Sequence, residues 1–328
     1  MGRIAIALIG AATTVACFAG AAQSAELITN RGASHVTLAV NAKGEALVTY
    51  RAGGQLRRVL VWGATNARLP TRNGKQVEFK RDFSGGWRTY HTTYWETFQD
   101  RCAPYNGPAL PDVVAACRAP DGSYWVAQAW QRLMPDLGYL PWLPVQRAKW
   151  LELSHWSGPV AQLDIGMNWV YDGKWQQIFT RTTYLGHPVY GFGTTRAGVP
   201  TDSFGQLVYI DTFNSTYGPG WRRENASVAH NPTGLFCYGL FPHDPTRGGY
   251  RHPPNQTTPR GPGIGNRYRI IAAGPGVTPN IEKVIAGLHD YDPGNPADVA
   301  RQQKQNATLE SWGGKRNPGG CLAGWFDA

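Results

Sequence analysis

Short runs in which apolar and polar residues alternate follow one another closely from residue 34 onward. Three of them occupy residues 34–40 (SHVTLAV), 45–50 (EALVTY) and 55–62 (QLRRVLVW), and the glycine-containing turns NAKG and RAGG separate them. Alternation with a period of two is typical of a strand with one buried face, and short turns of this kind join antiparallel neighbours. This part of the chain is therefore predicted to form an antiparallel β-meander.

The rest of the chain extends this pattern. Its 40 glycines and 24 prolines suit many tight turns rather than long helices. We predict strands at residues 87–98 and 123–130, one or two helical turns within residues 108–120, and a second series of strands from about Lys149. Strands at this close spacing predict an all-β fold with an antiparallel β-sandwich architecture.

The proline-rich joint LMPDLGYLPWLPVQ, residues 133–146, separates the two series of strands. We favour a division into two adjoining β subdomains, residues 26–140 and 141–328. The alternative is one large sandwich in which the joint is an internal loop, because about 300 residues suit either arrangement.

One helix is predicted near residues 296–312, close to the C-terminus. Asn295 suits the N-cap, Pro296 the first helical position and Gly313 the residue after the helix. The body of this segment is mostly polar, so its stability depends on docking through the few apolar side chains available, Val299, Leu309 and Trp312.

The first 25 residues have the features of a secretory signal peptide. Arg3 precedes an apolar run that ends near Gly20, and the small residues that follow place the predicted cleavage near residues 22–25. Cys17 raises the alternative of a lipid anchor, but Thr14 stands where lipoprotein processing favours an aliphatic residue. No later run of about 18 apolar residues occurs, so we predict a secreted protein without a transmembrane span.

Four cysteines follow the signal peptide: Cys102, Cys117, Cys237 and Cys321. An even number in an exported chain predicts disulfides. Among three possible pairings we favour Cys102–Cys117 with Cys237–Cys321, because the first pair flanks one short excursion. The alternative of a zinc site has no CxxC or HxxxH spacing to support it, and neither a metal site nor a cofactor is predicted.

The strongest hairpin signal in the chain is Asp172-Gly173, because a two-residue type I′ turn favours Asp-Gly. A turn of this length fixes the register of the two flanking strands, and it pairs Val170 with Trp175, Asn168 with Gln177, and Asp164 with Arg181. The opposite face is the more apolar and is the expected core face, with Leu163, Ile165, Met167, Trp169, Gln176, Ile178, Thr180 and Thr182.

The other face of this hairpin is the candidate ligand-binding surface. We expect Trp175 to be exposed there as an aromatic plate, beside Asp164, Asn168, Gln177 and Arg181. A ring can stack on the apolar face of a pyranose while amides and carboxylates bind its hydroxyls, so this face predicts polysaccharide binding. The alternative is that another sheet or the N-terminal subdomain covers the face and buries Trp175.

The net charge of +10 at pH 7 indicates attraction to anionic polymers or surfaces. Nucleic acid is not predicted as a partner, because no nucleic-acid motif accompanies the charge and the chain is expected to be exported. A polysaccharide or anionic cell-envelope polymer is the favoured partner. The alternative is that the charge serves solubility alone.

A secreted carbohydrate-active enzyme, a hydrolase or lyase, is the alternative function. Glu152, which lies between Trp150 and Trp156 in sequence, and Asp164 are the candidate acids, although no spacing selects them as a pair. No GxSxG elbow is present. A third alternative is a cell-surface module that binds another protein.

Residues 242–267 form a long loop that holds four arginines and one acid. Loops of this length within compact domains are often functional, and this one is a candidate basic clamp over the ligand; the alternative is a solvated excursion.

The segments ELSHWSGPVAQLDI, YIDTFNSTYGPGW and GLFCYGLFPHD resemble uncharacterised exported proteins of high-GC Gram-positive bacteria. The resemblance implies export and a bacterial host, and it carries over no activity and no functional residue.

Overall fold

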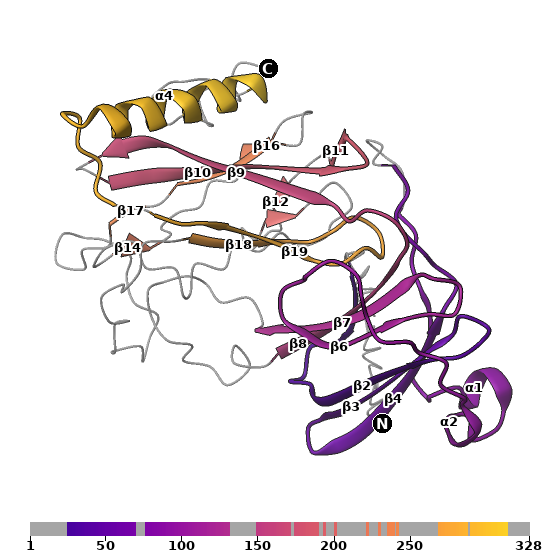
Figure 1. Cartoon of the computed structure of the whole chain (residues 1–328). Coiled ribbons are helices and arrows are strands. Elements are labelled where there is room, and N and C mark those ends of the chain that lie inside the picture. Colours follow the sequence, from indigo (N-terminus) through magenta and orange to yellow (C-terminus); the bar gives the residue numbers. More distant parts are fainter. Residues whose placement is uncertain are drawn as a thin grey trace, which may run out of the picture.

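A computed structural model describes residues 25–69, 76–131, 149–171, 174–189, 193–194, 200–201, 221–222, 229–230, 235–239, 241–242, 268–287 and 289–313. Strands dominate these residues, and every strand pairing among them is antiparallel. The predicted all-β fold with sandwich architecture and one C-terminal helix is confirmed (Figure 1). Apart from Ala25, the predicted signal peptide lies outside the described residues.

Two four-stranded sheets form the N-terminal sandwich (Figure 1). The first sheet has the strand order β1 (Glu26–Thr29), β8 (Lys149–Trp156), β7 (Tyr124–Gln131) and β6 (Val113–Arg118). The second has the order β2 (Ser34–Val40), β3 (Ala46–Ala52), β4 (Gln55–Trp62) and β5 (Lys80–Asp82). The predicted strands of the N-terminal meander are therefore present as β2, β3 and β4.

The inner faces of these two sheets share one apolar core. Val48 and Val59 from the second sheet and Trp125 and Leu153 from the first are each at most 1% exposed. Phe79 stacks on Trp125 with a distance of 5.3 Å between ring centroids. The core residues of β3 and β4 follow the alternation that the sequence shows.

Strand β8 is covered on both faces. Leu151 and Leu153 belong to the sandwich core, while the Glu152 side chain on the other face is hydrogen-bonded to Asn280. Because β8 pairs with β1 and β7, the first sheet extends past the domain boundary predicted at residue 140. The proline-rich joint lies outside the described residues, between the ends of β7 and β8, which are neighbours in this sheet.

Residues 87–98 were expected to be a strand, and this prediction is wrong. They contain two short helices, α1 (Trp87–Tyr90) and α2 (Tyr94–Thr97). Gly85 and Gly86, with φ of 68° and 104°, turn the chain sharply after β5 in a conformation that residues with a Cβ rarely adopt. The alternating aromatics of this segment therefore do not belong to a sheet.

The carboxylate of Asp82 holds this turn in place. It accepts hydrogen bonds from the backbone N–H of Ser84 at 2.8 Å and of Thr89 at 3.0 Å, and from the Thr89 hydroxyl at 2.9 Å. Burial acts to raise the pKa of Asp82, but these hydrogen bonds outweigh it and keep the pKa below its usual value. The carboxylate is therefore ionised at neutral pH and anchors α1.

The segment 108–120, predicted as helical turns, contains strand β6 instead, because β-branched residues such as Val113 and Val114 favour the extended conformation. Cys117 in β6 forms the predicted disulfide with Cys102, with an S–S distance of 2.04 Å. On the chain-entropy model, a loop of this length stabilises the fold by about 3 kcal/mol.

The C-terminal half is built on a five-stranded sheet. Its order is β11 (His187–Pro188), β10 (Lys174–Tyr184), β16 (Leu235–Gly239) and β15 (Ala229–His230), with β9 (Gln162–Tyr171) paired to β10. Strands β9 and β10 have the predicted register, which pairs Trp175 with Val170, Gln177 with Asn168, and Arg181 with Asp164. The hairpin prediction is confirmed.

Three two-stranded pairs complete the described strands. They are β12 (Gly193–Thr194) with β13 (Pro200–Thr201), β14 (Trp221–Arg222) with β17 (Phe241–Pro242), and β18 (Tyr268–Ala272) with β19 (Ile281–Ile285). Cys237 lies in β16, but Cys321 lies outside the described residues, so the second disulfide stays a prediction.

Helix α4 (Pro296–Ser311) lies along one face of the β9–β10 hairpin, and β18 with β19 lies on the other (Figure 1). As predicted, the Asn295 side chain caps the helix, accepting a hydrogen bond from the Ala297 N–H at 3.0 Å, and Pro296 begins it. Leu309 is fully buried.

Within the described part of the chain, no helix has the length and apolar character needed to span a membrane.

Candidate functional site

The expectation that Trp175 is exposed is wrong. Only 1% of this side chain is exposed, and its ring meets that of Tyr291 edge-on at 5.4 Å between centroids. The guanidinium of Arg301, from α4, lies 5.8 Å from the centre of the indole ring. Phe179, on the same face of the sheet, is fully buried and contacts Trp312. The C-terminal helix therefore covers the aromatic part of the predicted binding face.

The approach of α4 to the sheet is close. A Cβ atom on Gly166 would lie 2.1 Å from the Phe179 ring and 2.4 Å from the side-chain oxygen of Gln305. The backbone N–H of Met167 donates a hydrogen bond to that oxygen at 3.2 Å. Glycine is therefore required where strand and helix meet, and this surface is an internal interface.

Among the other predicted ligand-binding residues, the side chains of Asp164 and Arg181 are described. Asp164 is exposed and Arg181 half-buried, and the two pair in register between β9 and β10. Asn168 and Gln177 also pair in register, but their side chains lie outside the described part of the structure. The Trp175 ring is buried, so it offers these polar groups no exposed stacking surface.

Glu152 is buried within a hydrogen-bond network between the two halves of the protein. Its side chain is 2% exposed and accepts a hydrogen bond from Nδ2 of Asn280 at 2.6 Å. Asn280 is held in turn by Gln128, through bonds of 3.0 and 3.1 Å to its backbone N–H and carbonyl. The two candidate acids lie in different sheets, Glu152 in β8 and Asp164 in β9. Because Glu152 is buried, its carboxyl group is not accessible to a polymer.

A different site lies at one end of the N-terminal sandwich, where β1 and the residues after it face the β3–β4 hairpin. A cavity of about 690 Å³ opens there. We call it the arginine cavity; its lining residues are Leu27, Ile28, Thr29, Asn30, Arg31, Tyr50, Ala52, Gly53, Gln55, Arg57, Arg58, Val59 and Phe83. Three of these residues are cationic and none is acidic.

The local sequence explains how the arginines come together. Gly53 and Gly54 adopt φ of 58° and 76° and form a two-residue turn, so Ala52 pairs directly with Gln55. Two residues further along, Arg57 pairs with Tyr50 and shares the inward-facing side of β4 with Val59 and Val61. An arginine thus takes an inward position at the edge of the core, where the cavity opens.

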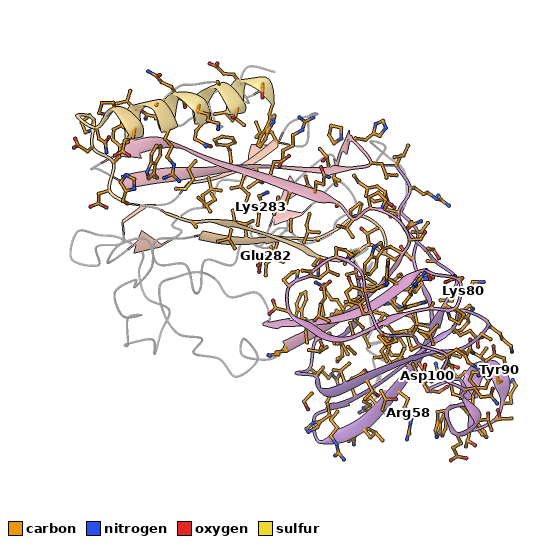
Figure 2. The ribbon with its side chains drawn as sticks, in the orientation of Figure 1. Arg58, Lys80, Tyr90, Asp100, Glu282 and Lys283 are labelled. Carbon is orange, nitrogen blue, oxygen red and sulfur yellow. A yellow bond between two sulfur atoms is a disulfide. The ribbon has the colours of Figure 1, made fainter. Side chains whose placement is uncertain are left out.

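The guanidinium groups are oriented by uncharged partners. Arg57 donates a hydrogen bond to the side-chain oxygen of Gln55, and Arg58 lies over the Trp95 ring at 5.3 Å from its centre. Figure 2 places Arg58 on the N-terminal sandwich, far in the view from Glu282 and Lys283 of β19. Guanidinium groups present several donors in a plane and bind carboxylate or phosphate through paired hydrogen bonds. The site therefore favours an anionic group.

Tyr50 adds a hydroxyl to this cavity, where it is 4% exposed. Burial raises the pKa of the hydroxyl above its usual value, although a hydrogen bond with Thr29 and the charges of Arg57 and Arg31 act in the opposite direction. The hydroxyl is therefore protonated at neutral pH. Arg31 and Arg57 line the same cavity as this hydroxyl.

Two exposed aromatic rings follow β5, and one of them, Phe83, lies at the cavity. The Phe83 side chain is 57% exposed and lines the cavity, and the Trp87 side chain is 50% exposed. Arg81 places its guanidinium 5.9 Å from the centre of the Phe83 ring. Cationic and aromatic groups thus occur together at this cavity.

Arg81 is itself tied to a buried acid. Its Nη1 lies 3.1 Å from Oε2 of Glu26 and donates a hydrogen bond of 3.1 Å to the carbonyl of Leu27, which lines the cavity. Glu26 is 4% exposed and also accepts a hydrogen bond from the backbone N–H of Phe79. Burial raises the pKa of this carboxyl to about 6, although Arg81 and the Phe79 N–H act to lower it.

The raised pKa of Glu26 predicts a specific dependence of stability on pH. The pKa of Glu26 is about 6 in the folded protein and 4.5 in the unfolded chain, so the folded state favours the protonated carboxyl. The stability of the fold that depends on this protonated form is fully present below pH 4.5 and is lost as the pH rises through 6. We therefore expect the free energy of unfolding of Glu26→Gln to increase relative to the unchanged protein across this interval. Urea unfolding of both proteins at matched pH values measures the difference; a constant or decreasing difference would contradict the assignment.

Arg31, Arg57 and Phe83 were not predicted from the sequence as candidate site residues. One signal was present: in QLRRVLVW, Arg57 has the same parity as Val59 and Val61, which marks it as an inward-facing arginine. Phe83 had no comparable signal. The basic loop 242–267, predicted as a clamp, lies outside the described residues except for Pro242.

Among the described residues, no three histidine, cysteine, aspartate or glutamate side chains gather as a metal site would require. Comparison of the chain with models of protein families, with curated proteins and with solved structures finds no match. The arginine cavity is therefore assessed by its own geometry and charge.

Proposed function

We propose that this protein is an exported binding protein that holds a polysaccharide or other anionic polymer of the cell envelope through the arginine cavity. The observation that carries the proposal is the presence of Arg31, Arg57 and Arg58 around one cavity with no acidic lining residue. Such a site attracts anions over a distance as well as at contact. The net charge of +10 adds to the attraction.

Two features of the chain support the proposed extracellular location. Stable disulfides form in oxidising surroundings outside the cytoplasm, and the bond between Cys102 and Cys117 is compatible with such a location. The features of residues 1–25 point the same way. Extracellular surroundings supply anionic glycans and envelope polymers as partners.

Binding is favoured over hydrolysis because of what the cavity lacks. Glycoside hydrolysis uses two carboxyl groups placed about 5–10 Å apart across the bond that is cleaved. The lining of the arginine cavity contains neither aspartate nor glutamate, and Glu152 is enclosed elsewhere. A polymer held there is expected to be retained unchanged.

Co-sedimentation of the purified, oxidised protein with insoluble polymers tests the proposal. We expect retention on calcium-alginate gel and on cell wall that keeps its anionic polymers. We expect little retention on cellulose, or on wall stripped of anionic polymers, and no release of soluble sugar. Equal retention on charged and neutral polymers would contradict the proposal, as would the release of sugar, which would favour the enzyme.

A further inference from the structure

We propose, building on the binding function above, that the arginine cavity and its rim recognise an acidic polysaccharide as such: Arg31 and Arg57 take the anionic group of one sugar while the Phe83 ring stacks on a pyranose. The polymer then contributes two features at once, a negative charge and an apolar ring face. A simple polyanion supplies only the first.

The first support is where exposed aromatic rings occur. Among the described large apolar side chains that are substantially exposed, only two are aromatic, Phe83 and Trp87. They are close in sequence, and Phe83 lines the arginine cavity itself. Elsewhere in the N-terminal sandwich, aromatic rings such as those of Trp125 and Trp156 are fully buried. One of the two exposed aromatic rings, that of Phe83, therefore lies at the cationic site.

The second support is the rigidity of the Phe83 backbone. Phe83 is the second residue of a turn that closes with a hydrogen bond of 3.1 Å from the Gly85 N–H to the Asp82 carbonyl. The Asp82 side chain, 4% exposed, fixes the same turn from within. The ring is therefore held outward by its backbone, and a ligand that stacks on it need not order a loop first.

The third support is that the rim combines an apolar ring with a positive charge. Phe83 has no hydrogen-bonding group, so it distinguishes partners only by the apolar surface they offer. Arg81 lies over the ring, and the positive charge reinforces the preference for anionic partners. Nucleic acid also combines phosphate with flat rings, but the disulfide is compatible with the proposed extracellular location, where acidic glycans meet the same requirement.

The test is a titration of the purified, oxidised protein with four soluble probes. They are a galacturonic acid oligosaccharide, a polyphosphate of similar charge, a neutral cellulose oligosaccharide and a single-stranded oligonucleotide. Phe83→Ala is compared with Leu185→Ala, which removes a side chain of similar exposure, 52%, beyond β10. We expect Phe83→Ala to lose about 5-fold in affinity for the galacturonic acid oligosaccharide and to keep its affinity for polyphosphate. Leu185→Ala should change neither.

The outcomes separate this inference from the function on which it rests. If Phe83→Ala binds the galacturonic acid oligosaccharide as well as the unchanged protein does, the stacking role is wrong while an anion-binding cavity survives. If the unchanged protein binds neither anionic probe, the proposed function itself fails. Tighter binding of the oligonucleotide that depends on Phe83 would overturn the assignment to sugars. An unaltered thermal midpoint for Phe83→Ala is expected, and it verifies that the exposed ring does not support the fold.

Discussion

Replacing Trp175 with alanine is expected to lower the free energy of unfolding by about 3–5 kcal/mol, the usual cost of removing a large buried aromatic side chain. The ring is 1% exposed and meets Tyr291 and Arg301 between the β9–β10 sheet and helix α4. Helix α4 has few other apolar contacts, because most of its side chains are polar. Loss of the ring should therefore weaken the docking of the helix as well as leave a void.

The matched control is Trp87→Ala, which removes the same side chain from a position that is 50% exposed. Its free energy of unfolding should change by no more than about 0.5 kcal/mol. Urea unfolding followed by circular dichroism measures both variants. If Trp175→Ala were as mild as the control and abolished retention on a polymer, Trp175 would be part of a ligand site and the burial described above would be contradicted.

Local signals in the sequence predicted two features of the C-terminal half, the register of one hairpin and the start of one helix. The Asp172-Gly173 dipeptide predicted the register of β9 and β10, because the length of a hairpin turn determines which residues face each other. Asn295 and Pro296 predicted the start of α4 in the same way. Each of these features depends on a few neighbouring residues, and so it can be predicted without the tertiary structure.

The exposure of the hairpin faces was not predictable by the same means. The faces were assigned correctly relative to each other, but whether the Trp175 face meets solvent depends on a helix more than 100 residues later in the chain. The apolar residues Val299, Leu309 and Trp312 predicted that α4 docks on the rest of the protein, but they did not indicate which surface it covers. Gly166, which permits its close approach, is a single residue whose role appears only when Phe179 and Gln305 lie beside it.

In the N-terminal half, hydrogen bonds from the backbone to one buried carboxylate and two glycines with positive φ outweighed the strand pattern. Residues 87–98 alternate aromatic and polar residues as a strand does, but Asp82 and two glycines with positive φ direct the chain into short helices. The rim of the arginine cavity depends on that turn. The cavity also joins residues from β1, β3 and β4, whose packing across two sheets no periodicity in the sequence indicates.

Replacing both Arg31 and Arg57 with glutamine is expected to weaken binding of an acidic polysaccharide by about 100-fold. A hydrogen bond to a charged partner contributes about 1.5–3 kcal/mol, and each step of 1.4 kcal/mol changes the dissociation constant about tenfold. Both side chains are exposed, so the fold should tolerate the change. Unchanged thermal midpoints would verify this.

A control must separate the cavity from the overall positive charge. Arg51 and Arg118 are exposed residues of β3 and β6 that do not line the cavity. Replacing both with glutamine removes the same net charge at a different place. Because long-range attraction depends on total charge, this double variant should reproduce the general electrostatic loss, which is small at physiological salt.

The account rests on the claim that ligand is held at the arginine cavity, and one measurement tests it most directly. The dissociation constant of a galacturonic acid oligosaccharide is determined for the unchanged protein, for Arg31→Gln/Arg57→Gln and for Arg51→Gln/Arg118→Gln at physiological salt. The account predicts a loss of about 100-fold for the cavity variant and at most about 3-fold for the control. Equal losses in the two variants, or none in either, would contradict it.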